Sequence, residues 1–207
     1  MGAHGDARED RAMRILGISG SLRGQSHNTR LLRGVAGMLP QGAELVVFDQ
    51  LGAIPPFNED EEHAPPPAVQ ALKDAIAGAD ALLVSTPEYN HSIPGVLKNA
   101  VDWASRPFAE NPLRGKPAAV IGASTSLFGA VWAQAELRKV LGAAGAQVLD
   151  RELPVAQAEE ALGPDGLPRE ADARAALEAT LDELIERGRS GLPDGRTESL
   201  DGGRAAA

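Results

Sequence analysis

Short apolar runs alternate with stretches of helical periodicity five times along this sequence, and this alternation restricts the fold more than any other feature. The apolar runs, which predict β-strands, are residues 14–18, 44–48, 81–85, 118–122 and 146–149. The stretches that predict amphipathic helices are residues 28–39, 68–77, 95–105, 131–141 and 167–186. The run at 81–85 reads ALLVS, as in a strand that is buried on both faces. Strands that alternate with helices favour a parallel sheet covered by those helices.

The predicted fold is an α/β three-layer sandwich of the flavodoxin-like type. Because crossovers between parallel strands are right-handed, the helices cover both faces of the sheet. Five strands suit the flavodoxin-like order 2-1-3-4-5 better than the six-stranded dinucleotide-binding fold. Ligands of such sheets bind beyond the carboxyl ends of the strands. The informative loops are therefore residues 19–28, 86–94 and 123–129.

Composition excludes several classes of protein. The 207 residues suit one domain, which we expect at residues 13–189, between polar tails at 1–12 and 190–207 that we expect to be disordered. A net charge of −9 argues against a general nucleic-acid binder, and the absence of cysteine excludes disulfides, thiolate metal sites and a cysteine nucleophile. No apolar run reaches the roughly 20 residues that cross a bilayer, and residues 1–12 lack the apolar core of a signal peptide. We therefore expect a cytoplasmic protein that binds neither a membrane nor nucleic acid.

The loop after the first strand predicts a phosphate site. It leads from a strand into a helix, and the free N–H groups and dipole of a helix N-terminus favour an anion. Neutral donors and one cation are concentrated there: Ser19, Ser21, Arg23, Ser26, Asn28 and Thr29. The loop fits neither a Walker loop, nor the G-x-G-x-x-G dinucleotide motif, nor the G-x-S-x-G esterase elbow. The alternative is a plain Ser/Gly turn with a helix N-cap, which needs only one or two such residues.

The loops after the third and fourth strands suit a flat ring. Prolines at both ends stiffen the first of these loops, which contains Pro87, Glu88, Tyr89 and Asn90. Its backbone N–H groups and its aromatic side chain match the edge of a heterocycle. Ser124 begins the other loop, a flexible Ser/Gly-rich segment that can approach a ring closely. For both loops an ordinary turn is the alternative, with Tyr89 packed on a helix in the first of them.

Taken together, the three loops resemble those of the NAD(P)H-dependent FMN reductase family, and most of all its quinone and chromate reductase branch. The matching segments are GISGSLRGQSHNTRLL, LLVSTPEYNHSIPGVLKNAVDW and GKPAAVIGAS. The resemblance implies a non-covalently bound FMN. It implies that the phosphate is held by Ser19, Ser21, Arg23, Ser26, Asn28 and Thr29, and that Pro87, Glu88, Tyr89, Asn90 and Ser124 contact the ring and the ribityl chain.

The same resemblance implies an enzyme that passes two electrons from NAD(P)H through FMN to a small acceptor. The acceptor is expected to be a quinone, free flavin, an azo compound or a metal oxyanion such as chromate. No side chain needs to act as an acid or a base, so we name no catalytic residue, and no histidines stand at metal-binding spacing.

The family also implies a homodimer or homotetramer. The helices that contain Trp103 and Trp132 are candidate contact faces, with ordinary packing of each tryptophan as the alternative. Two competing interpretations of the whole chain are an electron carrier of the flavodoxin type and a non-redox binding module that keeps the phosphate loop. Acidity suits a carrier, since such proteins dock to basic partners. The single tyrosine favours the reductase, because it leaves one face of a bound ring open for nicotinamide.

Overall fold

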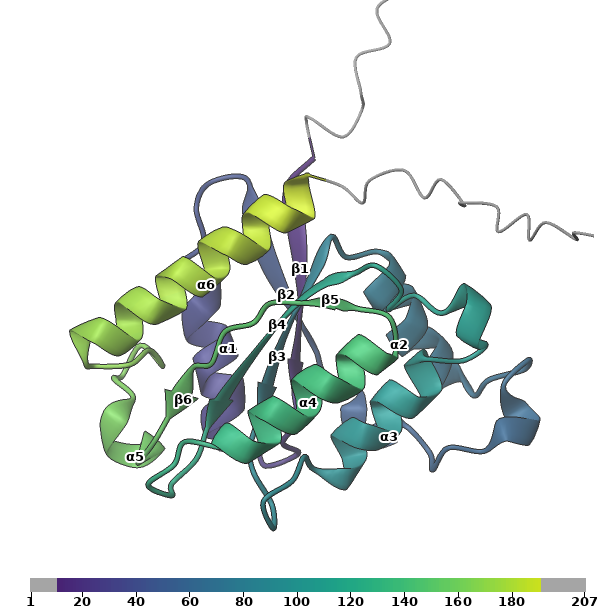
Figure 1. The fold of residues 1–207 in the computed structure, drawn as a ribbon, viewed down its shortest axis with the longest axis horizontal. Coiled ribbons are helices and arrows are strands. Elements are labelled where there is room, and N and C mark those ends of the chain that lie inside the picture. The colour runs from purple at the N-terminus through teal and green to yellow at the C-terminus, as the bar shows by residue number, and fades with distance from the viewer. Residues whose placement is uncertain (1–10, 191–207) are drawn as a thin grey trace, which may run out of the picture.

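A computed structural model describes residues 11–190, which form a three-layer α/β sandwich around one parallel sheet (Figure 1). The strands are β1 (Met13–Ser19), β2 (Ala43–Phe48), β3 (Ala81–Thr86), β4 (Pro117–Ala123), β5 (Gln147–Val148) and β6 (Pro154–Val155). The helices are α1 (His27–Ala36), α2 (Pro67–Ala77), α3 (Gly95–Ala104), α4 (Val131–Ala143), α5 (Ala158–Ala161) and α6 (Ala171–Arg189). The strand order β2-β1-β3-β4-β5 confirms the prediction, and β6 adds a short pairing with the end of β4.

The two central strands are buried on both faces. Every residue of β3 and β4 is buried, as the apolar run at 81–85 predicts for β3. The edge strand β2 differs, because its Glu44 and Val46 are exposed while Leu45 and Val47 pack on the core. Helices thus cover β3 and β4 from both sides and β2 from one side only.

The helices divide between the two faces of the sheet. Leu97 of α3 and Leu137 of α4 lie in one core together with residues of α2, whereas Leu31 of α1 lies in the other core together with residues of α6. Alternate residues of the central strands enter the two cores, so Leu82 faces the first and Leu83 the second. Because the strands are parallel, the loops after β1, β3 and β4 all leave the sheet at its carboxyl edge.

The last helix begins later than its apolar periodicity predicts. It starts at Ala171 rather than at 167, because the preceding residues form a compact turn. In that turn the N–H of Gly163 donates to the carbonyl of Leu167 (2.7 Å), and a β-bridge joins Leu162 to Pro168. Pro168 also disfavours helical backbone at Leu167. Leu167 is nevertheless buried, so its apolar side chain packs in the core although the residue lies outside the helix.

The turn at 163–167 packs directly on α1. A Cβ added at Gly34 of α1 would lie 2.7 Å from the carbonyl oxygen of Asp165, so only glycine allows this approach. Hydrogen bonds from the Leu167 N–H and from Arg174 hold the pKa of the Asp165 carboxyl below its usual range. The ionised carboxylate thereby stabilises the same turn.

The predicted tails lie outside the described residues except for Arg11, Ala12 and Ser190. Arg11 donates to the carboxylate of Asp80, and Ser190 follows the last turn of α6. In the part of the chain that is described, no helix is both long and apolar enough to cross a membrane.

Gly34→Ala is expected to lower the free energy of unfolding by about 1–3 kcal/mol, because the added methyl group collides with the backbone of the 163–167 turn. Gly142→Ala in α4 is the matched control, since a Cβ there meets nothing within 4 Å. It is expected to be neutral or to stabilise by up to about 1 kcal/mol through helix propensity. Chemical denaturation of both variants measures the difference, and equal effects would contradict the packing of the turn on α1.

Candidate active site

Three loops leave the sheet side by side at its carboxyl edge, where β1, β3 and β4 end (Figure 1). Backbone hydrogen bonds fix the points from which they start. The N–H of Gly20, just past β1, donates to the carbonyl of Ser85 in β3 (2.8 Å). The N–H of Ser124, just past β4, donates to the carbonyl of Val155 in β6 (3.0 Å). The structure therefore brings together the three loops in which the sequence places its candidate residues.

The hydroxyl groups of the first loop are connected by hydrogen bonds. Ser26 is the N-cap of α1, and its Oγ accepts the N–H of Thr29 (3.2 Å). Thr29 Oγ1 donates to Ser19 Oγ (2.8 Å), and the Ser21 N–H donates to the same oxygen at 3.4 Å. Ser21 Oγ in turn accepts the N–H of Arg23 (3.3 Å). These five predicted residues thus form one hydrogen-bonded turn at the start of the helix.

This turn has the donor chemistry of an anion site. Residues 19–29 contain no Asp or Glu, so no carboxylate repels an anion there. Among residues 11–190, no hydrogen bond engages the N–H of His27 or Asn28, so these helix-start donors remain for a ligand. Arg23 is exposed and adds a positive charge. Hydroxyls, free helix N–H groups and one cation together fit a phosphate.

The side chain of Asn28 has a different place from the other predicted phosphate residues. It is 2% exposed, and its Nδ2 donates to the carbonyl of Ala123 (2.9 Å). Its Oδ1 accepts the Ser85 hydroxyl (2.8 Å) and the N–H of Ala123 (3.0 Å). The amide therefore links the start of α1 to the ends of β3 and β4, and the backbone N–H of Asn28 remains as a donor for a ligand.

The loop after β3 folds into a tight hairpin. Tyr89 and Ser92 exchange two backbone hydrogen bonds of 3.0 and 3.1 Å, with Asn90 and His91 between them at φ 53° and 60°. Two positive φ values suit the right-handed twist of a two-residue hairpin. Tyr89 is 49% exposed rather than packed beneath a helix. The tyrosine side chain is thus available at the surface of the site.

Two carboxylates fasten this hairpin to α4. Glu88 Oε2 accepts the N–H groups of Trp132 and Ala133, both at 3.1 Å, and so caps the first turn of α4. Glu136 of α4 reaches back and accepts the N–H of Ile93 (3.3 Å). The segment from 88 to 93 is therefore held at both ends by the same helix.

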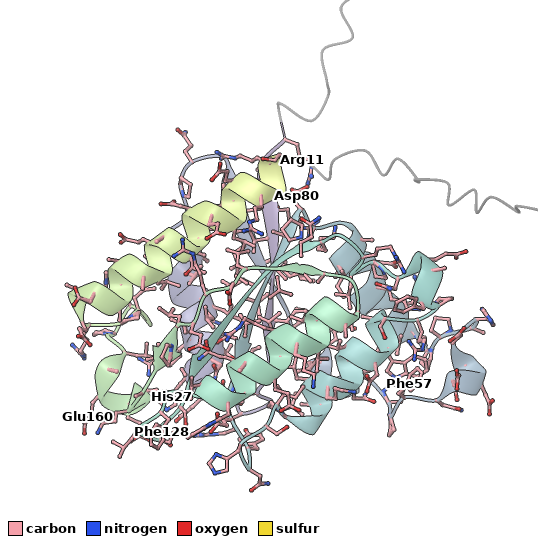
Figure 2. All side chains as sticks on the ribbon, in the orientation of Figure 1. Arg11, His27, Phe57, Asp80, Phe128 and Glu160 are labelled. Atoms are coloured by element: carbon pink, nitrogen blue, oxygen red, sulfur yellow. The ribbon has the colours of Figure 1, made fainter. Side chains whose placement is uncertain are left out.

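The loop after β4 is braced by β6. Gly129 has φ +58°, and a Cβ there would lie 2.7 Å from the carbonyl carbon of Pro154. Ser124 Oγ accepts the N–H of Ser126 (3.1 Å), which tightens the first turn of this loop. Leu127 and Phe128 at its tip are exposed, and Figure 2 shows Phe128 at the same end of the molecule as His27, the first residue of α1. The third loop starts beside α1, since Ala123 just before it is hydrogen-bonded to the Asn28 side chain.

The two tryptophans differ in their surroundings. Trp103 is fully buried, and its indole N–H donates to the carbonyl of Pro55 (2.8 Å), so packing accounts for this side chain. Trp132 is 42% exposed. Within the described residues, no three His, Asp or Glu side chains gather in a way that could hold a metal ion.

Sequence reasoning did not find the partners that position the loops. Ser85 carries a signal, since it is the first hydroxyl residue after the apolar residues of its strand. Ala123 contributes backbone atoms alone, which no side-chain pattern reveals. Glu136 lies inside a helix and reads as an ordinary polar position.

Fold and site together define a class: a flavodoxin-like α/β protein whose turn after β1 has the donor chemistry of an anion site. The sequence model of the NADPH-dependent FMN reductase family matches residues 13–160, and the chain belongs to that family. This membership confirms the predicted family and the prediction of an oxidoreductase with FMN as cofactor and NAD(P)H as co-substrate.

Similar proteins cover most of the chain. An NAD(P)H-dependent FMN reductase of Pseudomonas aeruginosa is 42% identical over 174 residues, which are 83% of this chain and 93% of the relative. A 2-hydroxy-1,4-benzoquinone reductase of Burkholderia sp is 36% identical over 173 residues, 83% of this chain and 94% of the relative. The solved structure of FerB, a flavoenzyme NAD(P)H:(acceptor) oxidoreductase from Paracoccus denitrificans, matches with a TM-score of 0.75 at 35% identity and covers 86% of this chain and 98% of FerB.

Asn28→Ala is expected to lower the free energy of unfolding by about 2–3 kcal/mol, because it leaves the Ser85 hydroxyl and both polar backbone atoms of Ala123 buried without these partners. Asn58→Ala is the control, since Asn58 is exposed and caps only a short 3₁₀ helix. For Asn58→Ala the free energy of unfolding is expected to fall by no more than about 1 kcal/mol. Chemical denaturation measures both, and a loss at Asn28 no larger than the control's would show that the buried amide does not hold the strand ends together.

Proposed function

We propose that this protein binds FMN at the carboxyl edge of the sheet and uses NAD(P)H to reduce quinones. The observation that carries the proposal is the turn before α1, where hydroxyl groups, free helix N–H groups and an exposed arginine gather with no carboxylate among them. That donor set suits the phosphate monoester of FMN. The relatives named as an FMN reductase and a benzoquinone reductase support the flavin and the acceptor respectively.

The residues present fit the phosphate end of FMN. In this proposal the side chains of Ser21, Arg23, Ser26 and Thr29 and the backbone N–H of Asn28 bind the phosphate, and Ser19 holds the turn in shape through Thr29. The Asn28 amide supports the turn indirectly, because its hydrogen bonds hold the start of α1 against the strand ends.

The other two loops would hold the ribityl chain and the ring. We assign this contact to Pro87, Glu88, Tyr89, Asn90 and Ser124. Glu88 contributes mainly through its place in the fastened loop, since its Oε2 is engaged by α4. A loop held at both ends presents its backbone groups in one position. Ligand binding then loses less conformational entropy, because the loop is already ordered.

Bound FMN would supply the two-electron carrier between the nicotinamide and the acceptor. Overall, NAD(P)H and one proton reduce a quinone to the hydroquinone, with NAD(P)⁺ as the other product. The chain itself positions the reactants, and the hydrogen bonds that Glu88 and Glu136 accept keep the second loop in place while the nicotinamide and the quinone exchange.

Several finer points belong to the same proposal. Free flavin, azo compounds and metal oxyanions such as chromate are further acceptors to assay with the same enzyme.

A homodimer or homotetramer is expected, and light scattering after size-exclusion chromatography measures the mass of the assembly. We also propose a cytoplasmic location, because NAD(P)H is available there.

An anaerobic titration tests the proposed function. FMN is added to the purified protein, then NADPH or NADH, and finally a quinone, while the flavin absorbance is followed against free FMN at the same concentration. We expect the absorbance of oxidised flavin to fall when nicotinamide is added, and only in the presence of the protein. The absorbance should recover when one quinone has been added per nicotinamide. FMN that binds but stays oxidised with both nucleotides would favour an electron carrier, and no FMN binding would favour a non-redox binding module.

Arg23→Ala is expected to weaken FMN binding about tenfold, the size of one charge-assisted hydrogen bond to a phosphate. Riboflavin, which lacks the phosphate, is expected to bind the variant and the unchanged protein equally. Arg33→Ala is the charge-matched control, because Arg33 is exposed in the last turn of α1, away from the helix start.

Quenching of flavin fluorescence gives all the dissociation constants, and raising the salt concentration should shrink the Arg23 effect. Equal weakening for FMN and riboflavin would place Arg23 away from the phosphate.

A further inference from the structure

Exposed apolar side chains gather at the carboxyl edge of the sheet. Among the described residues, the large hydrophobic side chains that are exposed are Leu22, Val46, Tyr89, Phe108, Leu127, Phe128 and Trp132. All of them except Val46 and Phe108 lie in the loops after β1, β3 and β4 or in the first turn of α4. Apolar surface concentrated at one end of a molecule marks a place where something binds.

Two rings in this region pack against the ring of Trp132, and we call His91, Phe128 and Trp132 the aromatic cluster. The His91 ring stands edge-on to the Trp132 ring with centroids 4.8 Å apart, and the Phe128 ring is tilted against Trp132 with centroids 4.9 Å apart. Phe128 is still 57% exposed and Trp132 42% exposed. Their mutual packing therefore leaves aromatic faces open to solvent.

Hydrogen bonds attach the aromatic cluster to the proposed flavin site. Glu88 accepts the backbone N–H of Trp132 at 3.1 Å and lies 3.7 Å from His91 Nδ1 through its other oxygen. Glu88 is in the loop that we assign to the flavin ring, and Phe128 is in the loop after β4. A molecule on the aromatic cluster would thus lie beside the loop that we assign to the flavin ring.

The charges around the aromatic cluster select against anions. Neither residues 87–93 nor residues 124–132 contain Lys or Arg. Glu88 Oε2 is engaged by the helix N–H groups, and the rest of these two segments combines aromatic and aliphatic side chains with hydroxyl groups and one amide. A metal oxyanion finds no cation here, whereas a neutral planar ring finds partners for offset or edge-to-face stacking.

We propose that the aromatic cluster binds the electron acceptor and selects planar aromatic quinones, with Trp132 as the main stacking surface. This inference rests on the proposed function, because it deepens the assignment of that same site. The ring system of a naphthoquinone stacks on Trp132 and Phe128, and the hydrophobic contact sets its affinity. The aromatic cluster makes no contribution to reduction by NAD(P)H.

Rapid mixing of the FMN-loaded enzyme separates the two half-reactions. Trp132→Ala keeps the backbone N–H that Glu88 accepts, so the loop stays fastened. For this variant we expect the concentration of 1,4-naphthoquinone at half-saturation to rise about tenfold, the effect of losing one aromatic contact. Reduction by NADPH, the affinity for FMN and the mass of the assembly should change less than about twofold by the same reasoning.

Two further variants act as controls. Trp132→Phe retains a stacking face and should recover most of the affinity for naphthoquinone. Phe108→Ala removes an aromatic side chain of similar exposure from the 3₁₀ helix Phe108–Glu110, which precedes β4 and so lies toward the opposite edge of the sheet. Phe108→Ala should leave both half-reactions unchanged.

An equilibrium measurement gives a readout that does not depend on turnover. The chain has two tryptophans and so two indole N–H resonances. Titration of the oxidised FMN-loaded enzyme with 1,4-naphthoquinone, without NAD(P)H, should shift the Trp132 signal. The signal of Trp103 should stay in place, because this indole is buried and donates to Pro55.

The outcomes separate this inference from the proposed function. A wild-type protein that fails to take up FMN, or whose FMN is not reduced by NAD(P)H, overturns the proposed function. A working wild-type enzyme whose Trp132→Ala variant binds naphthoquinone normally overturns the inference alone. Equal loss for NADPH and naphthoquinone, or a changed assembly mass with loss of both half-reactions, also overturns it, since the aromatic cluster would then serve the donor or a second copy of the chain.

Discussion

The buried amide of Asn28 is the contact on which the geometry of the site depends. It lies at the start of α1 but completes its hydrogen bonds at the ends of two other strands, through Ser85 in β3 and Ala123 in β4. A buried polar side chain needs all its partners, and Asn28 has them only when these strand ends stand in the observed register. The turn before α1 therefore takes its shape only once β1, β3 and β4 have paired, so formation of the candidate site is coupled to folding of the sheet centre.

The second loop is held by the same kind of interaction. Asn90 and His91 adopt left-handed backbone conformations, which cost roughly 1 kcal/mol or more each in residues other than glycine. The carboxylates of Glu88 and Glu136 stabilise this hairpin against α4 from both ends. A rigid frame of this kind suits a flavin enzyme, because the cofactor supplies the redox chemistry and the chain has only to keep the reactants in position.

Much of the fold was predictable because its causes are local. The apolar run at 81–85 became a strand that is buried throughout, and the apolar spacing of Leu31, Leu32 and Val35 became the buried face of α1. Errors arose where tertiary contacts override local pattern. Leu167 is apolar and in phase with α6, but it lies in a turn that packs on α1, and the two residues of β6 are too few to show any periodicity.

The sequence by itself determined the parallel sheet, its strand order and the three loops that form the site, because apolar runs, helical periodicity and loop motifs are properties of neighbouring residues. Only the tertiary structure decided what individual side chains do within that frame. The sequence does not show that the Asn28 side chain is buried and links strand ends, and Trp103 and Trp132 read alike but one is in the core and the other on the surface. Burial and hydrogen bonding of a side chain depend on segments far away in the sequence, which meet only when the sheet has formed.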